Sequence, residues 1–165
     1  MAAPLTVLTI PNPLLRQPSA PVDAATIARL TREGFFDALI ATMRLEDGVG
    51  IAAPQVGIPL RVIVVLEGRT PRVYCNPVVT TQSTKTKIDT EGCLSVPNII
   101  GIVTRAKNVS IRALDIRGKP VERRARDLTA RIFQHEVDHL DGILFIDRAI
   151  RTSTLPAGLV ANLRV

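Results

Sequence analysis

The stretch Gln134-His135-Glu136-Val137-Asp138-His139 contains both histidines of this 165-residue chain, with a glutamate directly after the first of them. Side chains four residues apart lie on the same face of an α-helix. Two neutral imidazoles at that spacing can bind one divalent metal ion, and the carboxylate of Glu136 can then reach a water molecule beside the metal. A lone histidine is more often a hydrogen-bonded core or surface residue, but the complete pattern predicts a metal site on a helix.

A catalytic site of the zinc type needs a third protein ligand and one open position. In one large class of metalloproteases a third histidine lies six residues after the second, but Phe145 occupies that position here. Asp141 and Asp147 are downstream carboxylates that could serve instead. Asp141 is the weaker of these candidates in geometry, because it lies only two residues after His139 and points off the histidine face.

The cysteines are better candidates for the third ligand. Cys93 lies in Glu91-Gly92-Cys93-Leu94-Ser95, where a glycine allows a close approach of the backbone. Cys75 lies inside the β-prone run Val73-Tyr74-Cys75, where a cysteine is more often simply buried. Cys93 is therefore favoured, and its thiolate would admit iron, cobalt or nickel as well as zinc.

Hydrophobic periodicity places these segments in an α+β fold. It predicts one long N-terminal helix that begins after Asp23 and ends near Asp47-Gly48, preceded by a proline-rich extended arm over residues 4–22. A second helix, over residues 127–141, carries the histidines and ends before Gly142. Between the helices, β-prone runs predict strands over residues 61–67, 72–80, 84–90, 100–104, 107–115 and 118–123.

The composition defines the class of protein. With 165 residues, of which 46% are hydrophobic and 22% charged, the chain is expected to form one globular domain over residues 1–165. Its two cysteines are too few for a disulfide framework, and its N-terminus has neither a signal-peptide nor a transit-peptide pattern. No stretch approaches the length of a membrane span. We therefore expect a cytoplasmic protein that does not bind membranes.

The net charge is +6, and the densest basic cluster consists of Arg123, Arg124 and Arg126. A solvated turn before a helix is the favoured interpretation of this cluster, and a weak attraction to RNA or another polyanion is the alternative. Aromatic residues make up only 3% of the chain and none interleaves with these arginines, which argues against sequence-specific binding of nucleic acid.

A third segment, Gly48-Val49-Gly50-Ile51-Ala52-Ala53-Pro54-Gln55, looks like a degenerate dinucleotide-binding fingerprint. The context is wrong for that function, because a predicted helix precedes the segment and a proline follows it. Its small residues suggest a backbone that approaches another group closely, and the amide of Gln55 is available to donate to an oxyanion. From this segment alone, a glycine-rich connection between two elements is an equal alternative.

Together, the three quoted segments resemble the signature segments of the peptide deformylase family in order and spacing. The N-terminal stretch Pro11-Asn12-Pro13-Leu14-Leu15-Arg16 is also similar to the usual start of that family, and the likeness extends to about Asp147. The resemblance implies a central metal-binding helix packed among partly open, mixed or antiparallel β-sheets. It also implies an enzyme that removes the N-formyl group from formyl-methionyl nascent polypeptides and releases formate.

The resemblance further implies a role for each matching residue. Cys93, His135 and His139 would bind the metal, which in this family is natively Fe2+ and is replaceable by Zn2+, Ni2+ or Co2+. Glu136 would act as general base and general acid. We expect a monomer whose partners are the peptide substrate and, transiently, the ribosome.

The substrate-binding residues also follow from the resemblance. Gln55 and the backbone N–H of Leu94 would form an oxyanion hole, and the backbone of Val49 and Gly50 would pair with an extended peptide. The residues implied for the pocket that receives the methionine side chain are Leu128, Arg131 and Ile132, together with Val49.

Two residues near that pocket depart from the family pattern, because Arg131 and Asp89 stand where many bacterial members carry apolar residues. We expect the charged end of Arg131 to reach water while its stem lines the rim of the pocket. We also expect Asp138 or a distant carbonyl to hold His135, and Glu91 to pair with Arg105.

Three other functions compete with this interpretation. A general metallopeptidase would share the helix and the general base. A closed structural metal site would take Cys75 or Asp141 as a fourth ligand. A basic nucleic-acid-binding module is the third, and the scarcity of aromatic residues makes it the weakest.

Overall fold

A computed structural model describes residues 2–156 of the chain. In chain order its elements are η1 (Pro13–Arg16), α1 (Ala24–Arg32), α2 (Phe35–Leu45), β1 (Gly50–Ala52), η2 (Ala53–Val56), β2 (Val62–Glu67), β3 (Thr70–Gln82), β4 (Thr86–Cys93), β5 (Val96–Ala106), β6 (Asn108–Leu114), β7 (Pro120–Arg126), α3 (Asp127–Leu140), α4 (Phe145–Arg148) and β8 (Arg151–Thr154). The chain therefore has an α+β fold, as the hydrophobic pattern predicts.

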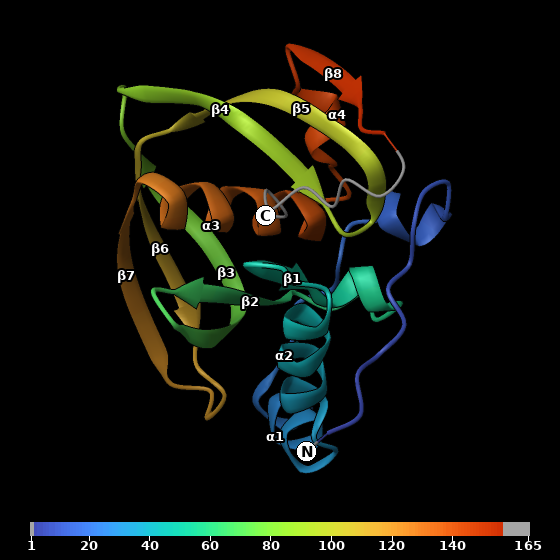
Figure 1. Cartoon of the computed structure of the whole chain (residues 1–165). Coiled ribbons are helices and arrows are strands. Elements are labelled where there is room, and N and C mark those ends of the chain that lie inside the picture. The colour runs from blue at the N-terminus through green and yellow to red at the C-terminus, as the bar shows by residue number, and fades with distance from the viewer. Residues whose placement is uncertain (1, 157–165) are drawn as a thin grey trace.

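The strands form two antiparallel sheets. One sheet has the strand order β1-β2-β3-β6-β7, and the other has the order β4-β5-β8. Helix α3 lies between the two sheets, and α1 and α2 lie at one end of the molecule (Figure 1). Because α3 contacts strands of both sheets, side chains on different faces of this helix meet different strands. Strand β8 is an addition to the predicted set.

The prediction of one long N-terminal helix is wrong. Residues 24–45 form two helices, α1 and α2, which meet at Gly34. Gly34 has φ +71°, a left-handed conformation that ends a right-handed helix and that glycine adopts without steric cost. Nothing lies within 4 Å of the position that a Cβ would take, so the backbone angle alone accounts for the glycine. The predicted start is confirmed, since the Asp23 side chain caps α1 by accepting from Thr26 N–H at 2.7 Å.

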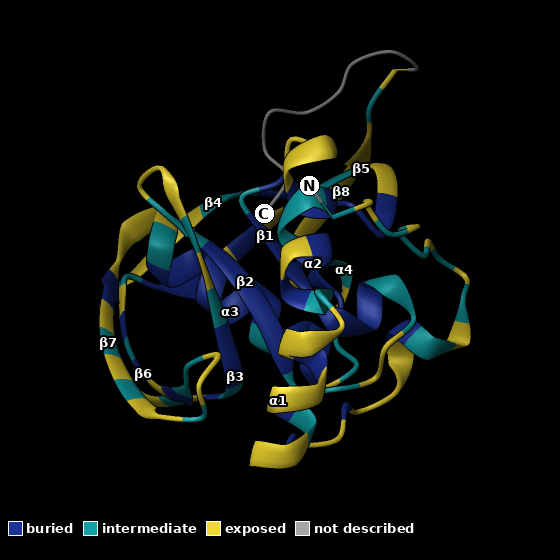
Figure 2. Cartoon of the chain, turned by 90° about the horizontal axis from the view of Figure 1, so that it is seen from below, coloured by how far each residue is buried: buried dark blue, intermediate teal, exposed yellow. Residues whose placement is uncertain are grey.

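The hydrophobic core holds α3 in place. Buried residues are concentrated along α3 and β2 (Figure 2). On the side of the five-stranded sheet, Phe133 of α3 meets Tyr74 of β3 edge-on, with ring centroids 5.1 Å apart. On the other side, the Gln134 amide of α3 accepts from the Ala106 N–H of β5 and donates to the Ala106 carbonyl, both at 3.0 Å. A helix packed on both sides has little freedom to rotate, so the positions of its polar side chains are fixed by the core.

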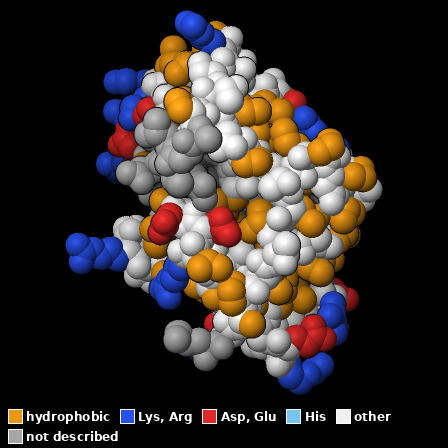
Figure 3. All heavy atoms as spheres, turned by 45° about the vertical axis from the view of Figure 1, so that its right-hand side comes forward, with side chains coloured by type: hydrophobic (Ala, Val, Ile, Leu, Met, Phe, Trp, Pro, Cys, Tyr) orange, Lys and Arg blue, Asp and Glu red, His pale blue; other side chains and the backbone are white. Residues whose placement is uncertain are grey.

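The surface is mixed in character. On the face shown in Figure 3, hydrophobic side chains cover a broad area and charged side chains lie mostly toward the margins. Among residues 2–156, the longest helix is α3, and no helix combines the length and the apolar character needed to cross a membrane.

Candidate active site

The three side chains proposed from sequence as metal ligands lie together. The sulfur of Cys93 and ring nitrogens of His135 and His139 all lie within 4.8 Å of one another, and all three residues are buried. Cys93 is the last residue of β4, whereas the histidines project from one face of α3. Cys93 Sγ and His139 Nε2 are 3.2 Å apart. Cys75 belongs to a different cluster, where it packs among apolar residues between β2 and the N-terminal helices.

Several polar atoms at this cluster have no hydrogen-bond partner in the described part of the chain. They are Nε2 of His135, Nδ1 of His139 and both carboxylate oxygens of Glu136. Leaving one buried polar atom unpaired costs about 1–3 kcal/mol. A cation between the thiolate and the imidazoles would use the free His135 nitrogen, so the donor set fits a divalent transition metal.

A buried ion-pair network surrounds His135. The Glu91 carboxylate lies 2.9 Å from His135 Nδ1 and accepts hydrogen bonds from Arg105 at 2.9 and 3.0 Å. The predicted pair of Glu91 and Arg105 is therefore confirmed. The prediction that Asp138 or a carbonyl holds His135 is wrong, because Glu91 takes that position and Asp138 accepts from Arg105 at 2.6 Å instead. Burial alone would raise the pKa of Glu91, but the hydrogen bonds and charges of His135 and Arg105 hold it below its usual range.

Arg131 also turns into this network, so the expectation that its charged end reaches water is wrong. The residue is 4% exposed, and its guanidinium donates to Glu91 at 2.7 Å. The same group donates to the carbonyls of Lys87, at 2.8 Å, and Val103, at 3.1 Å. The buried Glu91 carboxylate, the buried Val103 carbonyl and the partly buried Lys87 carbonyl therefore hold the guanidinium inside the fold. Asp89 pairs with Lys87 at the surface.

Gln55 is oriented by both ends of its amide. Its carbonyl oxygen accepts from Ala52 N–H at 2.8 Å, which directs its NH2 group toward the β4–β5 connection. That NH2 group lies 3.1 Å from Ser95 Oγ and 3.6 Å from Cys93 Sγ. Leu94 follows Cys93 directly and is 7% exposed. The two residues expected to bind an oxyanion therefore both lie next to the candidate metal ligand, Gln55 through its amide and Leu94 as its neighbour in the chain.

Gly50 explains why its segment is rich in small residues. A Cβ built on Gly50 would collide with the Glu136 carboxylate and with Ile132, so only glycine allows β1 to approach α3 this closely. The carbonyl of Val49 points toward β2, where it accepts a hydrogen bond from Leu66 N–H at 2.8 Å. Ile132 is buried, whereas Leu128, one turn earlier on α3, is 57% exposed. The residues expected to bind substrate thus extend from the interior to the surface.

The burial of the cluster shifts the protonation of its members. Burial raises the pKa of Glu136 well above its usual value, and the charge of Glu91 adds to this effect. Burial lowers the pKa of His139, with His135 contributing in the same direction. Burial also raises the pKa of Cys93 to about 12, so the thiol needs a bound cation to become a thiolate at neutral pH. Carboxyl groups with raised pKa values are suited to proton transfer near neutral pH.

Residues 4–154 match the family model described as polypeptide deformylase. The chain belongs to this family. The peptide deformylase of Syntrophomonas wolfei is 46% identical over 146 residues, which cover 88% of this chain and 93% of that protein. That of Halothermothrix orenii is 43% identical over 149 residues, which cover 89% and 94% of the two chains.

Solved deformylase structures agree with this assignment. The class I type b peptide deformylase of Acinetobacter baumannii with bound Met-Ala-Ser has a TM-score of 0.84 and 40% identity, covering 90% of this chain and 99% of that one. The peptide deformylase of Thermotoga maritima has a TM-score of 0.86 and 35% identity, covering 91% and 100%. The present chain is thus a deformylase, a hydrolase that removes the N-formyl group from nascent polypeptides.

Proposed function

We propose that this deformylase binds one divalent metal ion through Cys93, His135 and His139, natively Fe2+ with Zn2+, Ni2+ or Co2+ as substitutes. The support is the convergence of these three side chains and the free, buried nitrogen of His135. When bound, such an ion polarises the formyl carbonyl and lowers the pKa of the attacking water. We propose that residues 1–165 act as a single catalytic domain, with residues 1 and 157–165 lying outside the described part.

Glu136 is the proposed general base and general acid. It takes a proton from the water that attacks the formyl carbon, and it gives a proton to the amine nitrogen when the C–N bond breaks. Formate and a free N-terminus result. Both carboxylate oxygens are buried without a hydrogen-bond partner among residues 2–156, so neither is committed to another group. The raised pKa of Glu136 makes the carboxylate a better acceptor of the water proton, which it then passes to the amine nitrogen.

Gln55 and Leu94 are the proposed donors to the oxyanion. Negative charge grows on the formyl oxygen as water attacks, and the Gln55 NH2 group and the Leu94 N–H are proposed to donate to it. Gln55 suits this role because the hydrogen bond from Ala52 N–H fixes its amide before substrate binds. Donors held in place in advance are the effective ones in such sites.

The proposed substrate is an N-formyl-methionyl peptide that adds a strand beside β1. Strand β1 is at the edge of its sheet, paired only with β2 among the described strands. In an antiparallel pair, successive residues point their N–H and C=O groups to opposite sides. Because the Val49 carbonyl accepts from Leu66, the N–H and C=O groups of Gly50 face the open edge, where a peptide can pair with them.

The proposed pocket for the methionine side chain is formed by apolar groups. Ile132 and Val49 would provide its inner wall and Leu128 its exposed rim. Arg131 would contribute only its aliphatic stem, because its guanidinium is committed to Glu91 and two carbonyls. We also propose a cytoplasmic monomer that contacts the ribosome transiently.

Two rival functions have less support. A metallopeptidase with a third histidine is disfavoured because Phe145, at that position, is buried and stacks on His135 with ring centroids 6.1 Å apart. A closed structural site needs a fourth protein ligand. Cys75 lies in another cluster, and Asp141 pairs with Arg61 at 2.6 Å.

The convergence of Cys93, His135 and His139 carries the proposal, and metal analysis with a formate-release assay tests it. Protein purified without oxygen should contain about one metal ion per chain and release formate from formyl-Met-Ala-Ser. Glu136→Ala should keep the metal and lose about 10²–10⁴-fold in kcat. His135→Ala, the matched control on the same helix, should lose both. Cleavage of internal amide bonds without formate would contradict the proposal, as would full activity in Glu136→Ala.

A further inference from the structure

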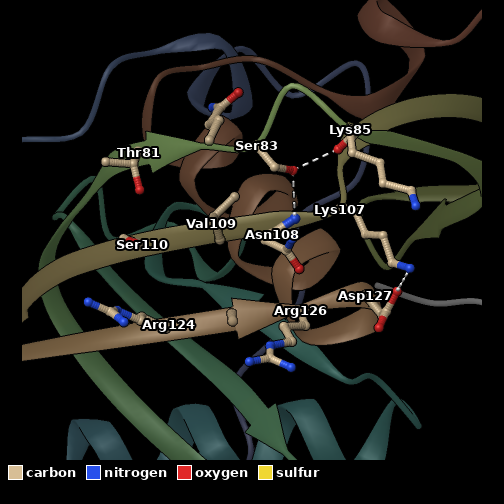
Figure 4. A pocket seen from close by; sticks show the side chains of 12 residues that line it. Thr81, Ser83, Lys85, Lys107, Asn108, Val109, Ser110, Arg124, Arg126 and Asp127 are labelled. Atoms are coloured by element: carbon tan, nitrogen blue, oxygen red, sulfur yellow. Dashed lines mark hydrogen bonds and ion pairs between the residues drawn. The ribbon is translucent and has the colours of Figure 1, made fainter.

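A second functional surface lies at the end of the five-stranded sheet, away from the metal ligands. Here a cavity of about 650 Å³ opens to solvent. It lies between strands β3, β6 and β7, the segment before β4 and the segment after β5. Its basic lining residues are Lys85, Lys107, Arg124 and Arg126 (Figure 4). The lysines come from the turn before β4 and from the β5–β6 connection, and the arginines come from β7.

Hydrogen bonds hold the backbone of this cavity in place. Ser83 Oγ accepts from Asn108 N–H at 3.0 Å and donates to the Lys85 carbonyl at 2.7 Å. Lys107 N–H donates to the same Lys85 carbonyl at 2.9 Å, and Asp127 N–H donates to the Lys107 carbonyl at 2.8 Å. The positions from which the lysine side chains project are therefore fixed relative to β6 and to the start of α3.

The arginines of β7 share one face of the sheet. Arg124 pairs in register with Ser110 and Arg126 with Asn108, so neutral polar residues stand opposite both cations. Residues two apart on a strand lie on the same face about 6.6 Å from each other. The result is a short row of positive charges flanked by hydrogen-bonding side chains.

The positive charge of this cavity is not compensated. Its one carboxylate, Asp127, lies 3.7 Å from Lys107, and Lys85, Arg124 and Arg126 form no ion pair within residues 2–156. Charged residues on an edge strand also prevent strands of two molecules from pairing, which is a sufficient reason for arginines on β7. That role does not explain why lysines from two other segments converge on the same cavity.

An adjacent cavity of about 460 Å³ provides the contrast. It also contains arginines, but each has a carboxylate partner. Arg61 pairs with Asp141, and both Arg105 and Arg148 pair with Asp138, each at 2.6 Å. In the 460 Å³ cavity every arginine thus has a carboxylate partner from the same chain. Of the two cavities, the 650 Å³ cavity is the one with basic side chains that form no ion pair within the described residues.

We infer that this basic cavity binds the phosphodiester backbone of RNA without reading its sequence. Cations from three segments around one cavity suit a polymer with one negative charge per unit, and Asn108 and Ser110 can donate or accept hydrogen bonds at phosphates and ribose hydroxyls. No aromatic side chain lines the cavity, so bases have no stacking surface. The inference rests on the proposed ribosome contact only for the origin of the RNA.

Fluorescence anisotropy with a labelled oligouridine of about 12 nucleotides tests the inference. With four phosphate contacts, the affinity of the wild-type protein should fall about 50-fold between 50 and 200 mM salt, since each contact to single-stranded RNA contributes about 0.7 to the salt slope. Arg124→Gln/Arg126→Gln should bind more weakly and lose only about 7-fold over the same range. The matched control is Arg32→Gln/Arg44→Gln, which removes the same charge from exposed positions of α1 and α2 and should behave like wild type.

Specific outcomes would overturn the inference. These are no binding at low salt, equal weakening by both double variants, or displacement of the RNA by polyglutamate or inorganic phosphate at equal charge. Formate release from formyl-Met-Ala-Ser, measured on the same preparations, separates the two proposals. Both double variants should release formate at the wild-type rate. A wild-type protein that binds RNA but releases no formate would refute the proposed reaction and leave the RNA site standing.

Discussion

Glu91 Oε2 lies 2.9 Å from Nδ1 of His135, and both atoms are buried. Because the pKa of Glu91 is held below its usual range, the carboxylate is the acceptor and Nδ1 carries the proton. Nε2 of His135 is then left with a free lone pair, and it has no other partner among the described residues. A carboxylate on β4 thus fixes the tautomer and orientation of an imidazole on α3.

Glu91→Gln tests this relationship. The amide keeps the shape of the side chain but removes the charge that holds His135 and Arg105. We expect metal affinity or kcat to fall about 10–100-fold, as for other residues that orient metal-binding histidines. The control is Asp138→Asn, which also weakens a contact to Arg105 but does not touch the imidazole. Metal titration measures the affinity of both variants. Equal losses of metal affinity in the two would show that Glu91 does not orient His135.

The same carboxylate should make the fold sensitive to acid. The pKa of Glu91 is lowered from its usual 4.5 in the folded state, so the unfolded chain takes up a proton first as the pH falls. The stability that ionised Glu91 contributes is therefore present above pH 4.5 and is lost below it. Urea unfolding of metal-free protein between about pH 6 and pH 3.5 should show a steeper loss for wild type than for Glu91→Gln. Parallel curves would contradict this.

The sequence predicts the metal ligands better than it predicts their supports. Residues 134–139 lie within one helix, so local periodicity is sufficient to place both histidines on one face. The partner of His135 is 44 residues away on β4, and no local pattern indicates that contact. Opposite charges predict the pair of Glu91 and Arg105, whereas the partner of the His135 imidazole depends on how β4 packs against α3.

Arg131 and Gly34 differ from the sequence predictions for different physical reasons. An arginine on a partly polar helix is expected to face water, but here Glu91 and two strand carbonyls supply partners that only the tertiary fold creates. Gly34 interrupts a continuous apolar stripe, and periodicity is insensitive to one residue with a positive φ. Strand β8 is short and exposed on every residue, so it has no alternating hydrophobic pattern to detect.

Arg131→Met should destabilise the protein by about 2–4 kcal/mol, because it removes one partner of a buried ion pair with Glu91 and two hydrogen bonds to carbonyls of β4 and β5. This loss of stability is toward the low end for removal of one partner of a buried ion pair, because Arg105 still pairs with Glu91. Arg29→Met is the matched control, since Arg29 forms an exposed pair with Glu33 that contributes about 0.5 kcal/mol or less. Urea midpoints measure both changes. A stability equal to wild type in Arg131→Met would mean that the buried pair is dispensable.

Gln55→Glu separates the acceptor of this side chain from its donor. A carboxylate can still accept from Ala52 N–H, so the loop should keep its conformation, but it has no N–H to donate. We expect kcat to fall about 10²–10³-fold with little change in KM, as for the loss of one oxyanion donor. Ser95→Ala removes only the hydroxyl that accepts from Gln55, and it should cost much less. A wild-type kcat in Gln55→Glu, at equal metal content, would show that the Gln55 NH2 group does not donate to the oxyanion.

Gly50→Ala tests the close approach of β1 to α3. The added methyl group would overlap the Glu136 carboxylate and Ile132, so the carboxylate must move away from the position at which it transfers protons. We expect at least a 100-fold loss of kcat together with a destabilisation of about 1–3 kcal/mol from overpacking. Gly68→Ala is the matched control, because Gly68 has φ +64° with open space around it, so alanine there adds backbone strain without a clash. It should lower stability and leave kcat unchanged. If Gly50→Ala kept wild-type kcat per folded molecule, Glu136 could not act from the position it occupies beside β1.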